Sequence, residues 1–290
     1  MKISVIVVTA RLGGFDVLCN SMRAQTGIDK SDWELIVVDD WHDDRILVDI
    51  GMSVRHLKPR ANDYLDPCYA NNLALRHAHG ELVVFFCDQE WAYPTFLADH
   101  WRIYQEFPGY TFSGFLDRYP MPTLKADITR QNSQWSIFES EFTESVAAEH
   151  FKNQEPVYRE RKGGTRGPAV ADMFEMPGDF VYFNVDSLPM AVIRDLNGLD
   201  ERYDGGYGIC DIDLGWRANR IGWKFLARDD GPVCNKLGMR SALVNLPRKP
   251  KKELRSVEEN RAFFHRRQDV IRSGKETVSI PQNYGAWRSR

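Results

Sequence analysis

Polar and charged side chains follow three short apolar runs of the sequence, at the point where each run ends. They are Thr9 and Arg11 after the run 3–8, Asp39 and Asp40 after the run 34–38, and Asp88 and Glu90 after the run 82–86. Ligands of an open parallel sheet bind beyond the carboxyl ends of its strands. If these runs are neighbouring parallel strands, four carboxylates meet in one crevice, and their repulsion calls for a bound cation or a hydrogen-bonded ligand.

The spacing of Asp88 and Glu90 suits a divalent cation. Two carboxylates one residue apart offer oxygen ligands to Mg²⁺ or Mn²⁺ while the metal also binds a diphosphate. Asp39 or Asp40 would accept hydrogen bonds from a nucleobase or a ribose, and Arg11 is a candidate for the diphosphate. For any single acidic strand end, a turn or a helix cap is about as good an interpretation.

A glycine-rich turn at 204–208 leads to Asp211 and Asp213 at the expected start of a helix. The helix macrodipole favours ionised carboxylates there. An ionised Asp211 would suit a general base that takes a proton from an attacking hydroxyl. The alternative is a capped helix whose acids only satisfy backbone N–H groups.

Strands and helices alternate along the first hundred residues, which predicts βαβ units and a parallel sheet. The strands are expected at 3–8, 34–38, 82–86 and 180–183, and the helices at 15–25, 67–79, 211–221 and 256–271. Gly80 is expected to cap the helix 67–79. Ser256 and Glu259 form a capping-box pattern for the last helix, and Gly274 lies just beyond its end.

These motifs, in their order, resemble the family 2 glycosyltransferases over about residues 3–100 and 178–235. The runs 3–9 and 34–40 look like the family's first two strands, 72–81 like the stretch before its metal strand, and 88–90 like its Asp-x-Asp motif. The segments 197–201 and 210–214 are similar to its acceptor site and share features with the β-1,4-galactosyltransferase type.

The resemblance implies an inverting enzyme of the GT-A fold, with a mostly parallel central sheet flanked by helices and a C-terminal helical tail. It implies roles for these residues: Thr9, Arg11, Asp39, Asp40, Asn72 and Asp88 in donor binding, Asp88, Glu90 and Asn235 as ligands of Mn²⁺ or Mg²⁺, Gly206, Tyr207 and Asp213 in acceptor binding, and Asp211 as catalytic base. The donor would be a nucleotide sugar, UDP-linked.

Three positions depart from the family pattern. The metal motif reads Asp-Gln-Glu, and a gapless register would place Cys87 and Gln89 under the usual aspartates. Cys210 replaces an acid that often precedes the base. The family's late metal-binding histidine is replaced by Asn235, a weaker ligand for manganese. His265 would substitute only if the tail folds back over the site.

The charge of the chain is unevenly distributed. Residues 236–290 hold 14 Lys and Arg against 5 Asp and Glu, whereas the whole chain has a formal net charge of −3.

We expect a GT-A domain at 1–235, with a nucleotide-sugar half at 1–107 and an acceptor half at 108–235 that includes a mobile loop near 159–168. The basic extension at 236–290 suggests an anionic partner, a membrane surface or a nucleic acid, with solvated surface charge as the alternative.

The composition excludes disordered and fibrous classes, and no apolar run is long enough for a transmembrane helix. Five widely spaced cysteines predict reduced thiols in a cytoplasmic protein, peripheral at a membrane if the tail binds one. The sequence therefore predicts a metal-dependent glycosyltransferase acting on a glycan hydroxyl, with no obligate protein partner. The alternatives are an inactive sugar-nucleotide-binding protein, a glycosyltransferase of modified nucleic acid or protein, and a nucleotidyltransferase.

Overall fold

The computed structural model describes most of the chain. The described residues are 1–10, 15–45, 51–52, 54–88, 90–113, 115–119, 158–160, 173–176, 178, 183, 186–228, 233–237 and 250–280. Of the loop expected near 159–168, only residues 159 and 160 are among them.

A central sheet has eight described strands, in the order β3-β2-β1-β4-β10-β6-β11-β9. Its strands are β1 Ile3–Thr9, β2 Trp33–Asp39, β3 Val54–Leu57, β4 Leu82–Phe86, β6 Tyr110–Ser113, β9 Met173–Met176, β10 Asp186–Pro189 and β11 Lys224–Arg228. The pairs β1–β2, β1–β4, β2–β3 and β6–β11 are parallel, and β10 and β9 run antiparallel to their neighbours. The predicted mostly parallel sheet is confirmed.

A second sheet has four described strands in the order β5-β12-β7-β8. They are β5 Glu90–Ala92, β7 Phe115–Tyr119, β8 Tyr158–Glu160 and β12 Val233–Leu237. Both sheets contain strands from 1–107 and from 108–235, so the two expected halves share their sheets. The division at 235 stays a prediction.

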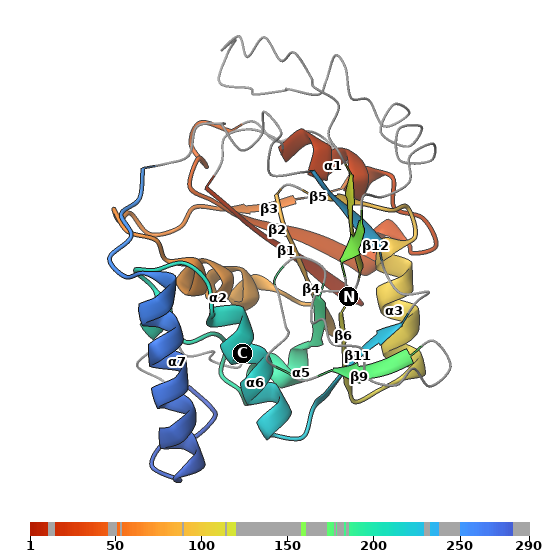
Figure 1. Ribbon diagram of the computed structural model, residues 1–290. Helices are drawn as coiled ribbons and strands as arrows, with labels where there is room; N and C mark the ends of the chain where they lie inside the picture. The colour runs from red at the N-terminus through yellow and green to blue at the C-terminus, as the bar shows by residue number, and fades with distance from the viewer. Residues whose placement is uncertain are drawn as a thin grey trace.

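Helices cover both faces of the central sheet (Figure 1). They are α1 Phe15–Arg23, α2 Pro67–His77, α3 Phe96–Glu106, α5 Met190–Asp195, α6 Cys210–Arg220 and α7 Val257–Arg272, with short 3-10 turns at Lys30–Asp32 and Glu201–Tyr203. Buried apolar side chains of α1 and α3, such as Leu18 and Leu97, belong to one cluster, and buried apolar side chains of α2, α5, α6 and α7 belong to another.

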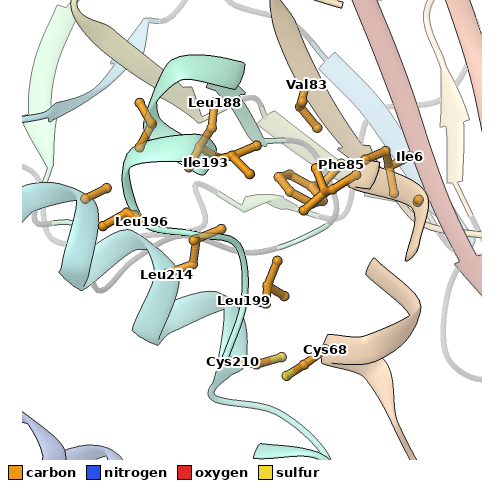
Figure 2. Packing of buried hydrophobic residues seen from close by; sticks show 14 of the residues in the cluster. Ile6, Cys68, Val83, Phe85, Leu188, Ile193, Leu196, Leu199, Cys210 and Leu214 are labelled. Atoms are coloured by element: carbon orange, nitrogen blue, oxygen red, sulfur yellow. The ribbon is translucent and has the colours of Figure 1, made fainter. Parts of the chain in front are cut away.

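The continuous apolar runs of the sequence follow from this arrangement. Successive side chains of a strand point to opposite faces, and in β1 Ile6 packs with the α2 and α6 side while Val5 and Val7 pack with the α1 and α3 side. Figure 2 shows the cluster on the α2 and α6 side, in which Ile6 and Phe85 of the sheet lie near apolar side chains of α5 and α6. A strand buried on both faces is therefore mostly apolar along its length, and the buried polar residue of β1, Ser4, donates a hydrogen bond to Glu34 of β2 at 2.7 Å.

One local prediction was wrong. Gly80 does not cap α2, which ends at His77 with Ala78 as its C-cap residue. Gly80 instead packs directly against β1, because a Cβ added there would lie 2.4 Å from the backbone nitrogen of Ser4. Of the strand expected at 180–183, only Phe183 is among the described residues, where it lies in a turn; the next described strand is β10.

The C-terminal helix α7 begins where the sequence predicts, and buried ion pairs attach it to the rest of the protein. Both hydrogen bonds of the Ser256–Glu259 capping box are present. Arg267, whose side chain is 1% exposed, donates from Nη1 to Asp213 at 2.6 Å, and its Nε lies 3.3 Å from Asp200. Arg217 donates to the second oxygen of Asp213 at 2.6 Å. A buried network of ion pairs thus connects α7 to α6 and to the turn before it.

Asp39 closes β2 with a second buried charge cluster. Its carboxylate accepts hydrogen bonds from Arg45 at 2.5 Å and from the backbone nitrogen of Trp41 at 2.8 Å. It also lies 3.0 Å from His56 Nε2. Burial raises the pKa of Asp39, but the contacts from His56 and Arg45 outweigh burial and leave the pKa below its ordinary value of 3.8. Asp39 therefore holds the end of β2 to β3 and to the turn that follows.

Arg267→Ala should destabilise the fold by about 3 kcal/mol, because it removes one partner of a buried ion pair and leaves Asp200 and Asp213 under-compensated. Urea unfolding measures the change. The control Arg266→Ala alters the exposed neighbour and should change the free energy of unfolding by less than about 0.5 kcal/mol. Equal effects of the two substitutions would contradict the network.

Asp39→Asn should destabilise the protein at pH 7 by about 2 kcal/mol, since its hydrogen bonds come from charged groups. A folded pKa below the unfolded value supplies stability that is present above pH 3.8 and is lost as the pH falls through the folded pKa. Urea unfolding at several pH values should therefore show the gap between wild type and variant closing below about pH 4. A gap of the same size at pH 7 and pH 3 would refute this interpretation of Asp39.

Candidate functional site

A cavity of about 380 Å³ lies beyond the carboxyl ends of β1, β2 and β4. Its lining from these strand ends includes Thr9, Asp40 and Asp88. The chain passes from β1 outward to β2 and β3 on one side and returns to β4 on the other. The cavity therefore lies at the point where the strand order reverses, which is where open α/β sheets bind ligands.

Thr9 and Asp88 meet across this reversal. The Thr9 hydroxyl donates to Asp88 Oδ2 at 2.7 Å, and both side chains are 2% exposed. Because β1 and β4 pair in parallel, their ends are adjacent and this bond fixes the carboxylate at the cavity wall.

Residues at and near the starts of two helices also line the cavity. Asp66 and Asn71 come from the start of α2, and Tyr207 and Asp211 come from the start of α6. The turn before α6 needs unusual backbone, with Gly205, Gly208 and Ile209 at φ of 94°, 76° and 74°. This tight turn brings Asp211, in the first turn of α6, to the cavity, where the helix dipole favours its ionised form.

Asp204 holds this turn to α2. Asp66, the N-cap residue of α2, makes no capping hydrogen bond with its side chain. The carboxylate of Asp204 instead accepts from the backbone nitrogens of Cys68 and Tyr69, at 2.8 and 3.1 Å. Figure 2 shows Cys68 and Cys210 pointing toward one another where α2 and α6 approach. The two helix starts are thus fixed relative to each other.

The cavity lining carries an excess of negative charge. Its carboxylates are Asp40, Asp66, Asp88, Asp211 and Glu253. Lys251 is the sole lysine or arginine of the lining within the described part of the chain, and its ammonium lies 2.9 Å from Asp40 and 2.8 Å from Asp66. Burial raises the pKa of Asp40 despite the hydrogen bond from Lys251. An anionic ligand would need further cations in such a site.

Three of the predicted site residues that do not line the cavity are held by contacts within the fold. Asp39 binds Arg45 and its neighbours, and Asp213 binds Arg217 and Arg267. Asn72 of α2 pairs with the backbone of Leu199 through both ends of its amide, at 2.8 and 2.9 Å. Each of these side chains makes contacts that hold the fold.

The predicted metal ligands are distributed differently from the expectation. Asp88 lines the cavity, whereas buried Glu90 accepts from the backbone nitrogen of Cys87 at 3.2 Å and does not line it. Asn235 lies in β12 beside Trp91 of β5, and its side chain is outside the described set. His265 is exposed on α7. No cluster of three or more potential ligands exists among the described residues.

The donor set at Asp88 still fits Mg²⁺ or Mn²⁺. Magnesium usually binds through one or two carboxylates together with substrate phosphates and water. Asp88 supplies a carboxylate next to a hollow whose charge favours a cation.

The remaining predicted residues are placed as follows. Gly206 pairs by backbone with Arg255, next to the lining residue Tyr207, which is 64% exposed. Arg11 lies outside the described residues. No described helix has the length and apolar character to span a membrane.

Sequence reasoning missed Lys251, Glu253 and Asp66. Asp66 precedes Pro67 at the start of a predicted helix, which is a visible N-cap signal. Lys251 and Glu253 precede the capping box of α7 in a short polar stretch. No local pattern of the sequence connects that stretch with a cavity formed by residues 9, 40 and 88.

Comparisons with known proteins establish the fold. No protein-family model and no curated protein matches the sequence. S. aureus TarS 1-349 in complex with UDP aligns with a TM-score of 0.54 at 16% identity, covering 82% of this chain and 61% of that one. The same protein in complex with UDP-GlcNAc gives a TM-score of 0.52 at 15% identity, covering 82% and 59%.

A mannosyltransferase from Pyrobaculum calidifontis, in complex with GDP-Man and Mn²⁺, gives a TM-score of 0.48 at 14% identity, covering 81% of this chain and 56% of that one. This chain thus spans about three fifths of the TarS structures' length. The likeness to TarS, at a TM-score above 0.5, is one of fold. The chain has a GT-A type glycosyltransferase fold.

Proposed function

We propose that this protein is an inverting, metal-dependent glycosyltransferase that moves a sugar from a UDP-sugar to a hydroxyl of a glycan acceptor. The observation that carries the proposal is the cavity itself. It brings Thr9, Asp40 and Asp88 from three strand ends together with Asp211 from a helix start. The TarS structures of similar fold are complexes with UDP and UDP-GlcNAc.

The donor would lie across the strand ends. Asp40 accepts hydrogen bonds from the nucleoside part, on the β2 side, and Asp88 lies on the β4 side with the diphosphate. A bound Mn²⁺ or Mg²⁺, held through Asp88, would neutralise charge on the leaving diphosphate. The negative lining supports this requirement, since the cavity contains five carboxylates whose charge a bound diphosphate would add to.

Asp211 is the proposed base. It lines the same hollow, and an acceptor hydroxyl held between Asp211 and the donor would attack the anomeric carbon from the face away from the nucleotide. Asp211 removes the hydroxyl proton as the new bond forms, and the sugar inverts. Tyr207 at the exposed rim offers an aromatic face to an acceptor sugar.

A nucleotide-sugar-binding protein without catalysis is the second candidate. The observation in its favour is that Glu90 does not line the cavity, which leaves Asp88 as the described carboxylate of the degraded metal motif. Release of UDP from a UDP-sugar separates the two candidates, because a binding protein retains the donor intact.

Asp211→Asn should lower kcat for transfer by about 10²- to 10⁴-fold, because the hydroxyl loses its base. The affinity for UDP should stay within about twofold, since base catalysis contributes to the transition state alone. The assay is UDP release from a panel of UDP-sugars with a panel of glycoside acceptors and Mn²⁺. Asp195→Asn, at an exposed position of α5, is the control. Transfer at the wild-type rate by a folded Asp211→Asn variant would rule out this base.

Mn²⁺ should raise the affinity of the wild type for UDP at least about tenfold, and EDTA should reverse the gain. Asp88→Asn should abolish the gain while leaving the metal-free affinity nearly unchanged. Glu90→Gln, outside the lining, should keep most of it. Calorimetric titration of UDP with and without Mn²⁺ measures all three proteins, and a full metal gain in Asp88→Asn would exclude Asp88 as the ligand.

A further inference from the structure

A C-terminal segment, residues 250–256, runs over the cavity as a strap. Its backbone binds two turns that are far away in sequence. Lys252 pairs with the turn before α2, donating to Asp63 at 2.6 Å and accepting from Leu65 at 3.1 Å, and Leu254 donates to Gly205 at 2.6 Å. Figure 1 shows this blue segment beside the orange loop before α2.

The two lysines of the strap differ in exposure. Lys251 and Glu253 line the cavity, whereas the intervening Lys252 has a side chain 70% exposed and Leu254 is 61% exposed. Two adjacent lysines therefore point in opposite directions. One enters the hollow and the other pairs with Asp63 at 2.7 Å in solvent.

Lys251 is held as a buried cation. Its side chain is 9% exposed, and its ammonium bridges Asp40 at 2.9 Å and Asp66 at 2.8 Å. Burial lowers the pKa of Lys251, but the two carboxylates more than compensate and raise it. The ammonium is thus charged and presents hydrogen-bond donors next to a carboxylate acceptor.

The position of this pair within the cavity indicates which part of a ligand it meets. Asp40 follows β2, Asp88 follows β4, and β1 lies between them. If the diphosphate lies at Asp88, the nucleoside lies on the β2 side of the cavity. A neighbouring donor and acceptor match a base edge that carries a keto oxygen beside a ring N–H, as in uracil and guanine.

We propose that Lys251 is a specificity residue that donates to the keto oxygen of such a base while Asp40 accepts from the adjacent ring N–H; this rests on the proposed function. Lys251 is held by the strap and Asp40 by the end of β2, so the donor and the acceptor keep fixed positions relative to each other. Cytosine and adenine present an amino group beside an unprotonated ring nitrogen, so in the same pose the amino group meets the ammonium and two donors face each other. A site built to bind one edge rejects the other because its buried polar groups stay unpaired.

The test is calorimetric titration of the full chain with UDP, GDP, CDP and ADP at fixed Mg²⁺ and salt. The wild type should bind UDP or GDP at least about tenfold more tightly than CDP and ADP, and the better of the first two identifies the base. Lys251→Met should weaken the preferred nucleotide by about 10- to 100-fold and change CDP by less than about threefold. Lys252→Met, the outward neighbour, should change neither.

Each other result is informative. Equal losses for UDP and CDP in Lys251→Met would mean that the ammonium only balances charge, and no loss would mean that it does not touch the nucleotide; both overturn the inference but leave the proposed function. Failure of the wild type to bind any of the four would overturn both. If Lys251→Met does not fold, Lys251→Arg and the wild-type preference among the four nucleotides decide, and an absent preference overturns the inference.

Discussion

The buried ion pairs of Arg267 with Asp200 and Asp213 are the interaction on which the placement of the helix α7 depends. A charge this deeply buried is stable only with its partners in place, so α7 has one docking position on α6. From that position Asn260 donates to the carbonyls of Tyr203 and Gly208, at 3.3 and 3.4 Å. The turn that carries Tyr207 toward the cavity is therefore supported by a helix that begins fifty residues later.

The same docking explains the uneven charge of the chain. Within the described part of the tail, the basic side chains that reach the body meet its acids: Lys251 binds Asp40 and Asp66, Lys252 binds Asp63, and Arg267 binds Asp213. The exposed surface of α7 carries charges of both signs, such as Glu258 beside Arg261. Part of the basic excess therefore pairs with carboxylates of residues 1–235, and it reduces the repulsion among those carboxylates.

Local patterns predicted what is locally determined. The strands β1, β2 and β4 are mostly apolar because both faces are covered, and the polar residues at and beyond their ends identified Thr9, Asp40 and Asp88. The capping box at Ser256 is equally local. β10 was missed because Asp186-Ser187-Leu188-Pro189 lacks strand-forming residues, and its place depends on pairing with β4 and β6. Lys251 was missed for the same reason, since backbone contacts with remote turns bring it to the cavity.

In two pairs of nearby aspartates, the periodicity of the strand or helix distinguishes the residue that holds the fold from the residue that lines the cavity. Along β2, Val38 faces the α2 side, so Asp40 continues that face into the cavity while Asp39 turns to the opposite one. In α6, residues two apart differ by about 200° around the helix, so Asp211 at the cavity directs Asp213 inward to Arg217 and Arg267. In each pair one carboxylate is held by buried cations and fixes the backbone. Its neighbour is thereby presented to the cavity, where a free-standing carboxylate would have no defined position.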